Sequence, residues 1–80
     1  MRWIQIPGGL RQIETGPKGA VWGVNKIKEI WYRAGVSRSK PQGTHWVKVA
    51  GSLVHVTVGC NAVYGINHHG QIWRYIGAVN

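Results

Sequence analysis

The sequence predicts an all-β fold, and three observations support this prediction. The 80 residues include twelve Gly and five Trp, with many Val and Ile but no Ala/Leu/Glu-rich stretch, a composition that favours strands over helices. Short runs of β-branched and aromatic residues alternate with turn-forming Gly, Pro and Asn. The two halves of the chain also carry the same pattern of Trp, Gly and Leu.

This internal repeat has a period of 42 to 43 residues. Residues 3–10 (WIQIPGGL) align with 46–53 (WVKVAGSL) at an offset of 43. Farther along, residues 20–25 (AVWGVN) align with 62–67 (AVYGIN) at an offset of 42. A fixed period in this range is typical of β-propeller blades, each of which is a four-stranded antiparallel sheet. The chain is therefore expected to form two blades.

Turn residues divide each repeat into short strands that alternate in direction. Residues 1–80 are expected to be a single two-blade unit, with repeat 1 at about 3–45 and repeat 2 at about 46–80. The expected strands, from the inner to the outer edge, are 10–15, 20–24, 30–33 and 46–49 for the first blade, and 53–58, 62–66 and 72–75 for the second.

The order of strands along the chain is shifted relative to their order within a blade, because residues 3–6 have the pattern of an outer strand but no blade precedes them. We expect this segment, from Trp3 to Ile6, to complete the second blade of a neighbouring chain by strand exchange, which would protect two open edges. A chain this short also buries little surface and has a single cysteine, Cys60, so assembly is its route to stability. Because propellers typically have four to eight blades, dimers, trimers and tetramers all stay open.

The motif W-x-x-I-P-G-x-L-x-x-I, followed by V-W-G-V-N and I-W-Y-R, resembles the tectonin repeat of tectonins, horseshoe-crab tachylectin and fish egg lectins. The resemblance implies a six-bladed propeller, hence a homotrimer of two-blade chains, that binds bacterial lipopolysaccharide or surface glycans. It also suggests a secreted or extracellular protein. Two features depart from the family: its members usually carry six repeats on one chain, and the second repeat reads Trp73-Arg74-Tyr75 where the first reads Trp31-Tyr32-Arg33.

Sugar recognition uses a flat aromatic face for the CH side of the ring and polar groups for its hydroxyls. Trp31 and Trp73 are placed to reach a groove between blades, whereas Trp22 and Tyr64 are expected in the blade core. Asn25 and Asn67 end strands, where they cap a turn or line a site. His68 and His69 are expected to point in different directions, and no metal site is expected. The candidate ligand-binding residues are Trp31, Trp73, Arg33, Arg74, Asn25, Asn67, His68, His69, Lys26 and Lys28.

Charge points to an anionic partner, since ten Lys and Arg against two Glu give a net charge of +8. Three such chains would carry about +24, and the phosphates of a glycolipid would suit Lys and Arg. The leading prediction is thus a multivalent carbohydrate-binding lectin. Two alternatives are a designed or reconstructed propeller scaffold without a specific ligand, and a basic nucleic-acid-binding module. The nucleic-acid reading is disfavoured because most aromatic residues are committed to the core.

Catalysis is not expected, because two carboxylates in the whole chain leave no paired acid and base in either repeat. No phosphate-binding loop, nucleophile elbow or dinucleotide fingerprint occurs, so no cofactor is expected. The N-terminus lacks a signal-peptide core, and no apolar run approaches the roughly 20 residues that span a bilayer. We therefore expect neither membrane insertion nor targeting by this stretch of sequence.

Overall fold

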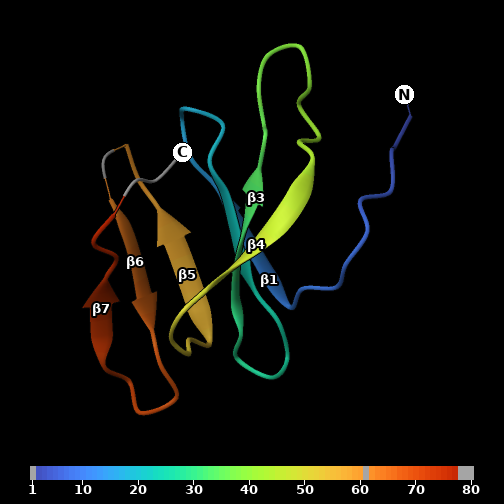
Figure 1. The fold of residues 1–80 in the computed structure, drawn as a ribbon. Helices are drawn as coiled ribbons and strands as arrows, with labels where there is room; N and C mark the ends of the chain where they lie inside the picture. The colour runs from blue at the N-terminus through green and yellow to red at the C-terminus, as the bar shows by residue number, and fades with distance from the viewer. Residues whose placement is uncertain (1, 61, 78–80) are drawn as a thin grey trace.

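The computed structural model describes residues 2–60 and 62–77, which form two antiparallel sheets side by side (Figure 1). The first sheet has the strand order β1-β2-β3-β4 and the second has the order β5-β6-β7. The prediction of an all-β chain built from blade-like units is confirmed. The strands are β1 (Gln12–Thr15), β2 (Val21–Val24), β3 (Ile30–Ala34), β4 (His45–Val49), β5 (His55–Val58), β6 (Val63–Ile66) and β7 (Ile72–Arg74).

The two sheets, called here the first blade (β1 to β4) and the second blade (β5 to β7), repeat the same pairing. Trp22 lies opposite Tyr32 in the first blade, and the residues 42 positions later, Tyr64 and Arg74, lie opposite each other in the second. Each blade's first strand begins two residues later than expected. Leu10 and Leu53 pack over glycines of the adjacent strand, at positions that a Cβ atom would fill, so these leucines cover their own blade instead of extending it.

The core lies between the blades, because one face of the first blade packs on the opposite face of the second. Trp22 is 2% exposed; its ring stacks on Tyr32 at 5.6 Å and meets Tyr75 edge-on at 5.0 Å. Aromatic pairs of this kind each stabilise by about 0.5 to 1.5 kcal/mol beyond the area that they bury. The buried residues are Ala20, Trp22, Val24, Ile30, Val49, Val56 and Val63.

The two innermost strands, β1 and β5, are joined through a side chain. The amide of Gln12 donates from Nε2 to the Val56 carbonyl at 2.8 Å, and its Oε1 accepts from the Val56 amide at 2.9 Å. A glutamine side chain thus completes the hydrogen bonding of an inner strand edge. This pair of bonds, called here the Gln12 clamp, fixes the position of β5 along β1.

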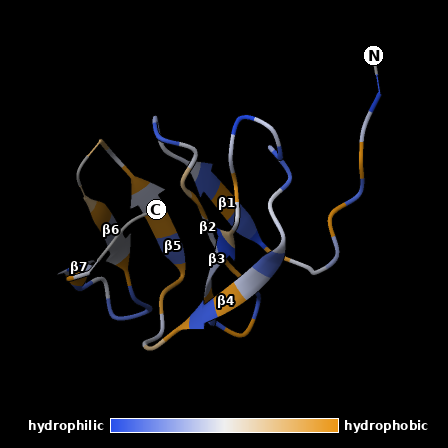
Figure 2. Ribbon diagram, turned by 45° about the horizontal axis from the view of Figure 1, so that its top comes forward, coloured by the Kyte–Doolittle hydropathy of each residue, from blue (hydrophilic) through white to orange (hydrophobic). Residues whose placement is uncertain are grey.

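The outward faces of the pair are uncovered within the described residues. Tyr64 is 45% exposed, so its expected place in a blade core is wrong for the single chain, because no blade lies on that face. Residues 3–6 form no strand here; they run away from both sheets and carry hydrophobic positions (Figure 2). Trp3 is 94% exposed. No helix in the described part of the chain could cross a membrane.

Candidate functional site

The turns between the second and third strands of both blades are held by an asparagine. Asn25 Oδ1 accepts from the amides of Ile27 and Glu29 at 3.1 and 2.9 Å, and its Nδ2 donates to Glu29 Oε1 at 2.8 Å. Asn67 makes the same three bonds within its own turn, with Gln71 in place of the glutamate. The turn-capping role expected of these asparagines is confirmed. Their polar atoms are largely engaged in shaping the loops.

The first of these turns contains a glutamate that forms an ion pair. Glu29 Oε2 lies 3.1 Å from Lys48 Nζ on the adjacent outer strand. The Asn25 hydrogen bond, followed by Lys48, lowers the pKa of the Glu29 carboxyl below its ordinary value, so Glu29 stays ionised. In the second blade the counterpart is neutral Gln71.

Four of the predicted site residues lie in these two turns, which are both at the lower edge of the molecule in Figure 1, with the β4–β5 segment between them. Lys26, Lys28, His68 and His69 are all exposed there, and this set is called the cationic loop edge. The His68 and His69 rings are 3.9 Å apart, so the expectation that they point in different directions is wrong. Alternation of side chains belongs to strands, and both residues lie in a turn.

The charges on the cationic loop edge repel one another. The pKa of His68 is lowered, first by the charge of His69, then by partial burial and by Lys28 from the other blade. Repulsion among these groups keeps His68 neutral at a pH where an isolated imidazole would begin to protonate. A phosphate or carboxylate placed here would relieve that repulsion.

A groove on the first blade brings together two predicted residues, Trp31 and Asn25. It has a volume of about 230 Å³ and is called the first groove; its lining is Gly8, Gly9, Leu10, Asn25, Trp31 and Trp46. The Trp46 indole Nε1 donates to the Pro7 carbonyl at 2.6 Å, and the ring lies against Gly8. Gly8 has a φ of 116°, which favours glycine, and a Cβ there would meet the indole.

Arg33 lies away from the first groove. Its guanidinium sits 5.1 Å from the centre of the Trp46 ring, and its Nε donates to the Gln42 carbonyl at 2.9 Å. A cation over an aromatic face is stabilising by about 0.5 to 1 kcal/mol at an exposed position. Arg33 therefore holds Trp46 and the β3–β4 loop.

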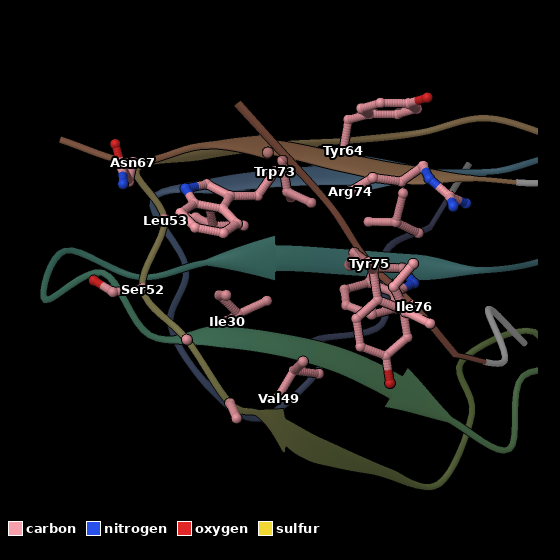
Figure 3. Close-up of a pocket in the computed structure, with 16 residues that line it drawn as sticks. Ile30, Val49, Ser52, Leu53, Tyr64, Asn67, Trp73, Arg74, Tyr75 and Ile76 are labelled. Carbon is pink, nitrogen blue, oxygen red and sulfur yellow. The ribbon is translucent and has the colours of Figure 1, made fainter. Parts of the chain in front are cut away.

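A larger cleft opens between the blades, with a volume of about 460 Å³ (Figure 3). It contains three more predicted residues: Asn67, Trp73 and Arg74. Its opposite wall is the core face of the first blade, including Trp22, whose buried Nε1 has no hydrogen-bond partner in the described structure. Because this nitrogen is itself shielded from solvent, a ligand in the cleft does not reach it unless the surrounding side chains move. This space is called the interblade cleft.

The first groove and part of the interblade cleft lie at equivalent positions in the two repeats. Shifting the first-groove residues by 42 or 43 positions gives Gly51, Ser52, Leu53, Asn67 and Trp73, all of which line the interblade cleft. The sequence prediction found both Trp and both Asn residues of this repeated site. It missed the Gly-x-Leu segments and Trp46, although the same offset of 43 would have revealed them.

Comparison with known proteins identifies the family. A sequence model of the Tectonin domain matches residues 1–80. The chain belongs to the tectonin domain family. This match confirms the resemblance seen in the sequence.

Two curated relatives show how this tectonin chain is placed among longer proteins. It is 47% identical over 47 residues to the fish-egg lectin of Cyprinus carpio, across 59% of this chain and 20% of the relative. It is 35% identical over 60 residues to tectonin beta-propeller repeat-containing protein 1 of Mus musculus, across 74% of this chain and 5% of the relative. The chain thus spans only a small part of either relative's length.

Proposed function

We propose that this tectonin chain is a carbohydrate-binding lectin module that uses the repeated site in each blade. The observation that carries the proposal is the interblade cleft, where Trp73 offers an aromatic face beside the polar side chains of Asn67 and Arg74. Its volume of about 460 Å³ is within the range of small-ligand sites. The similarity to a fish-egg lectin supports the same class of ligand.

The class of glycan follows from charge. The cationic loop edge adjoins the cleft, because Asn67 lines the cleft and opens the turn that carries His68 and His69. A phosphorylated glycan, such as the core and lipid A region of lipopolysaccharide, would place its sugar against Trp73 and its phosphate against Lys28 and the histidines. Neutral glycans would use the cleft alone.

Multivalency follows from repetition. Two sites per chain, and six in a trimeric ring, would raise the avidity of weak single sites for a surface that repeats its glycans. The proposed activity is binding without chemical conversion of the ligand, because neither Glu14 nor Glu29 lines the first groove or the interblade cleft, and Glu29 is paired with Lys48.

The test is a binding titration of the 80-residue chain against lipopolysaccharide, its dephosphorylated form and a glycan array. Trp73→Ala is expected to weaken binding at least about tenfold, as for truncation of a central aromatic contact. Folding should survive, since Trp73 is largely exposed. Ser39→Ala is the control, because Ser39 is an exposed residue of the β3–β4 loop and lines neither the first groove nor the interblade cleft.

Charge is tested separately. Lys26→Gln with Lys28→Gln should weaken binding of phosphorylated but not of dephosphorylated glycan, whereas Lys18→Gln with Arg38→Gln, on the opposite loop edge, should change neither. If no glycan binds while duplex DNA binds with a steep salt dependence, the nucleic-acid reading replaces the lectin. Absence of any ligand would favour a bare scaffold.

A further inference from the structure

The two turns of the cationic loop edge have the same backbone shape but different charged groups. Equivalent asparagine hydrogen bonds hold both turns, and the φ of 71° at Lys28 recurs as 78° at Gly70. The offset of 42 places His68 where the first repeat has Lys26. A lysine keeps its charge near neutral pH, whereas an imidazole changes charge between about pH 5 and pH 8. The charge of the second turn therefore depends on pH.

This titratable turn lies at the rim of the interblade cleft. Asn67 lines the cleft and is followed directly by His68 and His69. Its Oδ1 accepts from the His69 amide at 3.0 Å, which fixes the shape of the turn. From the first blade, the Lys28 carbonyl accepts at 3.1 Å from the amide of Leu53, another residue of the cleft. Two imidazoles and one lysine thus share the rim.

The groups around the histidine pair offer no free counter-ion among the described residues. The one carboxylate in the adjacent turn, Glu29, is bound to Asn25 Nδ2 at 2.8 Å and to Lys48 Nζ at 3.1 Å. The other charged or titratable groups on the neighbouring turn and strands are positive or, at neutral pH, uncharged: Lys26, Lys28, Lys48, His55, Tyr64 and Arg74. A proton added to the pair is therefore stabilised by an anion from outside this part of the chain.

We propose that His68 and His69 determine which glycans the interblade cleft accepts. When protonated, they hold an anionic ester group of the glycan, and when neutral, they leave the cleft to uncharged glycans. This inference rests on the proposed lectin function and adds the condition under which a charged ligand is held. The ring centres are 3.9 Å apart, so one sulfate or phosphate group can lie against both rings. Hydrogen bonds between an ionised donor and an oxyanion are about twice as strong as neutral ones.

Proton uptake and anion binding are then coupled. In the unliganded chain the charge of His69, followed by desolvation and by Lys28, lowers the pKa of His68. A bound anion favours the protonated imidazole and raises this pKa. Affinity for an anionic glycan therefore increases as the pH falls and decreases as the pH rises. A rise of about one unit corresponds to about tenfold tighter binding by the protonated form than by the neutral form.

The first experiment uses inorganic sulfate and needs no glycan. The imidazole resonances of the 80-residue chain are followed by proton NMR from about pH 5 to about pH 8, where histidine titrates. Sodium sulfate is compared with sodium chloride at equal ionic strength, because screening alone also weakens the repulsion. Sulfate keeps its charge in this range, whereas a phosphate ester takes up a proton near pH 6.

Sulfate should raise the titration midpoint of His68 by about half a unit or more relative to chloride. The resonances of His45, which begins β4 at the opposite end of the first blade, should be the same in both salts. His69→Asn and Lys28→Gln should each reduce the effect of sulfate on His68, and the matched control Lys18→Gln should not. The four side chains that are replaced or observed in the turns lie on exposed residues, so the variants should keep the fold. Equal responses of His68 to sulfate and chloride, or a Lys18→Gln effect equal to that of His69→Asn, would overturn the proposal.

The second experiment compares the sulfated and unsulfated forms of one glycan. Lowering the pH from about 7.5 to about 5.5 should tighten binding of the sulfated form about tenfold and leave the unsulfated form unchanged. His68→Lys should remove this pH dependence, because an ammonium group stays charged. Binding of the sulfated form that does not change with pH would refute the selective role of the histidines. A sulfate response at His68 without binding of any glycan would refute the lectin proposal and leave the anion site.

Discussion

The Gln12 clamp offers a direct test of how two blades are held together. Replacing Gln12 with Met keeps the length of the side chain but removes both hydrogen bonds to Val56, at 2.8 and 2.9 Å. Each bond is worth about 0.5 to 1.5 kcal/mol net. The two together give a loss of about 1 to 3 kcal/mol, because the half-buried β5 edge is left without a partner.

The assay is urea unfolding at a fixed chain concentration, since assembly would otherwise shift the midpoint. Gln71→Met is the matched control: this amide bonds only within its own exposed turn, and a change within about 0.5 kcal/mol is expected. Gln12→Glu should be as harmful as Gln12→Met at pH 7, because a carboxylate cannot donate to the Val56 carbonyl. It should recover part of the loss below a pH of about 4, where the acid is protonated. Equal midpoints for Gln12→Met and Gln71→Met would refute the clamp.

Two further predictions concern strain and pH. Lys28 has a φ of 71° where the second repeat has Gly70 at 78°. Because a glycine adopts this backbone conformation without strain, Lys28→Gly should raise the free energy of unfolding by about 1 kcal/mol. A lower free energy of unfolding would show that the backbone at Lys28 is not strained. Because the folded chain lowers the pKa of His68, mainly through the charge of His69, the unfolded chain binds more protons and stability should increase as pH rises towards 6.5. His68→Asn should flatten this slope in thermal melts between about pH 5.5 and about pH 7.5, roughly one unit either side of an ordinary imidazole pKa. An unchanged slope would count against the interaction between His68 and His69.

The repeat explains why so much of the fold was predictable. Strand positions depend on local chemistry, such as β-branched residues between Gly and Asn turns, and the offset of 42 to 43 copies those positions from one blade to the next. Asn25 and Asn67 cap their turns through bonds to residues two and four positions later. Local contacts of this kind are encoded in a few consecutive residues.

The site itself was only partly predictable, because its walls come from distant segments. Trp31 and Trp73, predicted as aromatic residues at repeated positions, line the first groove and the interblade cleft. Arg33, predicted as a ligand contact, lies over the Trp46 ring. The partner of Gln12 lies 44 residues away in the next blade. Neither contact has a signature in the neighbouring sequence, since both depend on how one sheet face meets another.

The sequence by itself determined that the chain is all-β, that it has an internal repeat of 42 to 43 residues, and that it resembles the tectonin family. Only the tertiary structure showed in which repeat the second strand is covered by another sheet and in which repeat it is exposed. Trp22 is buried and Tyr64 exposed although they occupy the same position in the repeat, because burial depends on the sheet that packs against a face. Local sequence specifies a strand and its two faces; the neighbour that covers each face is set by the arrangement of whole blades.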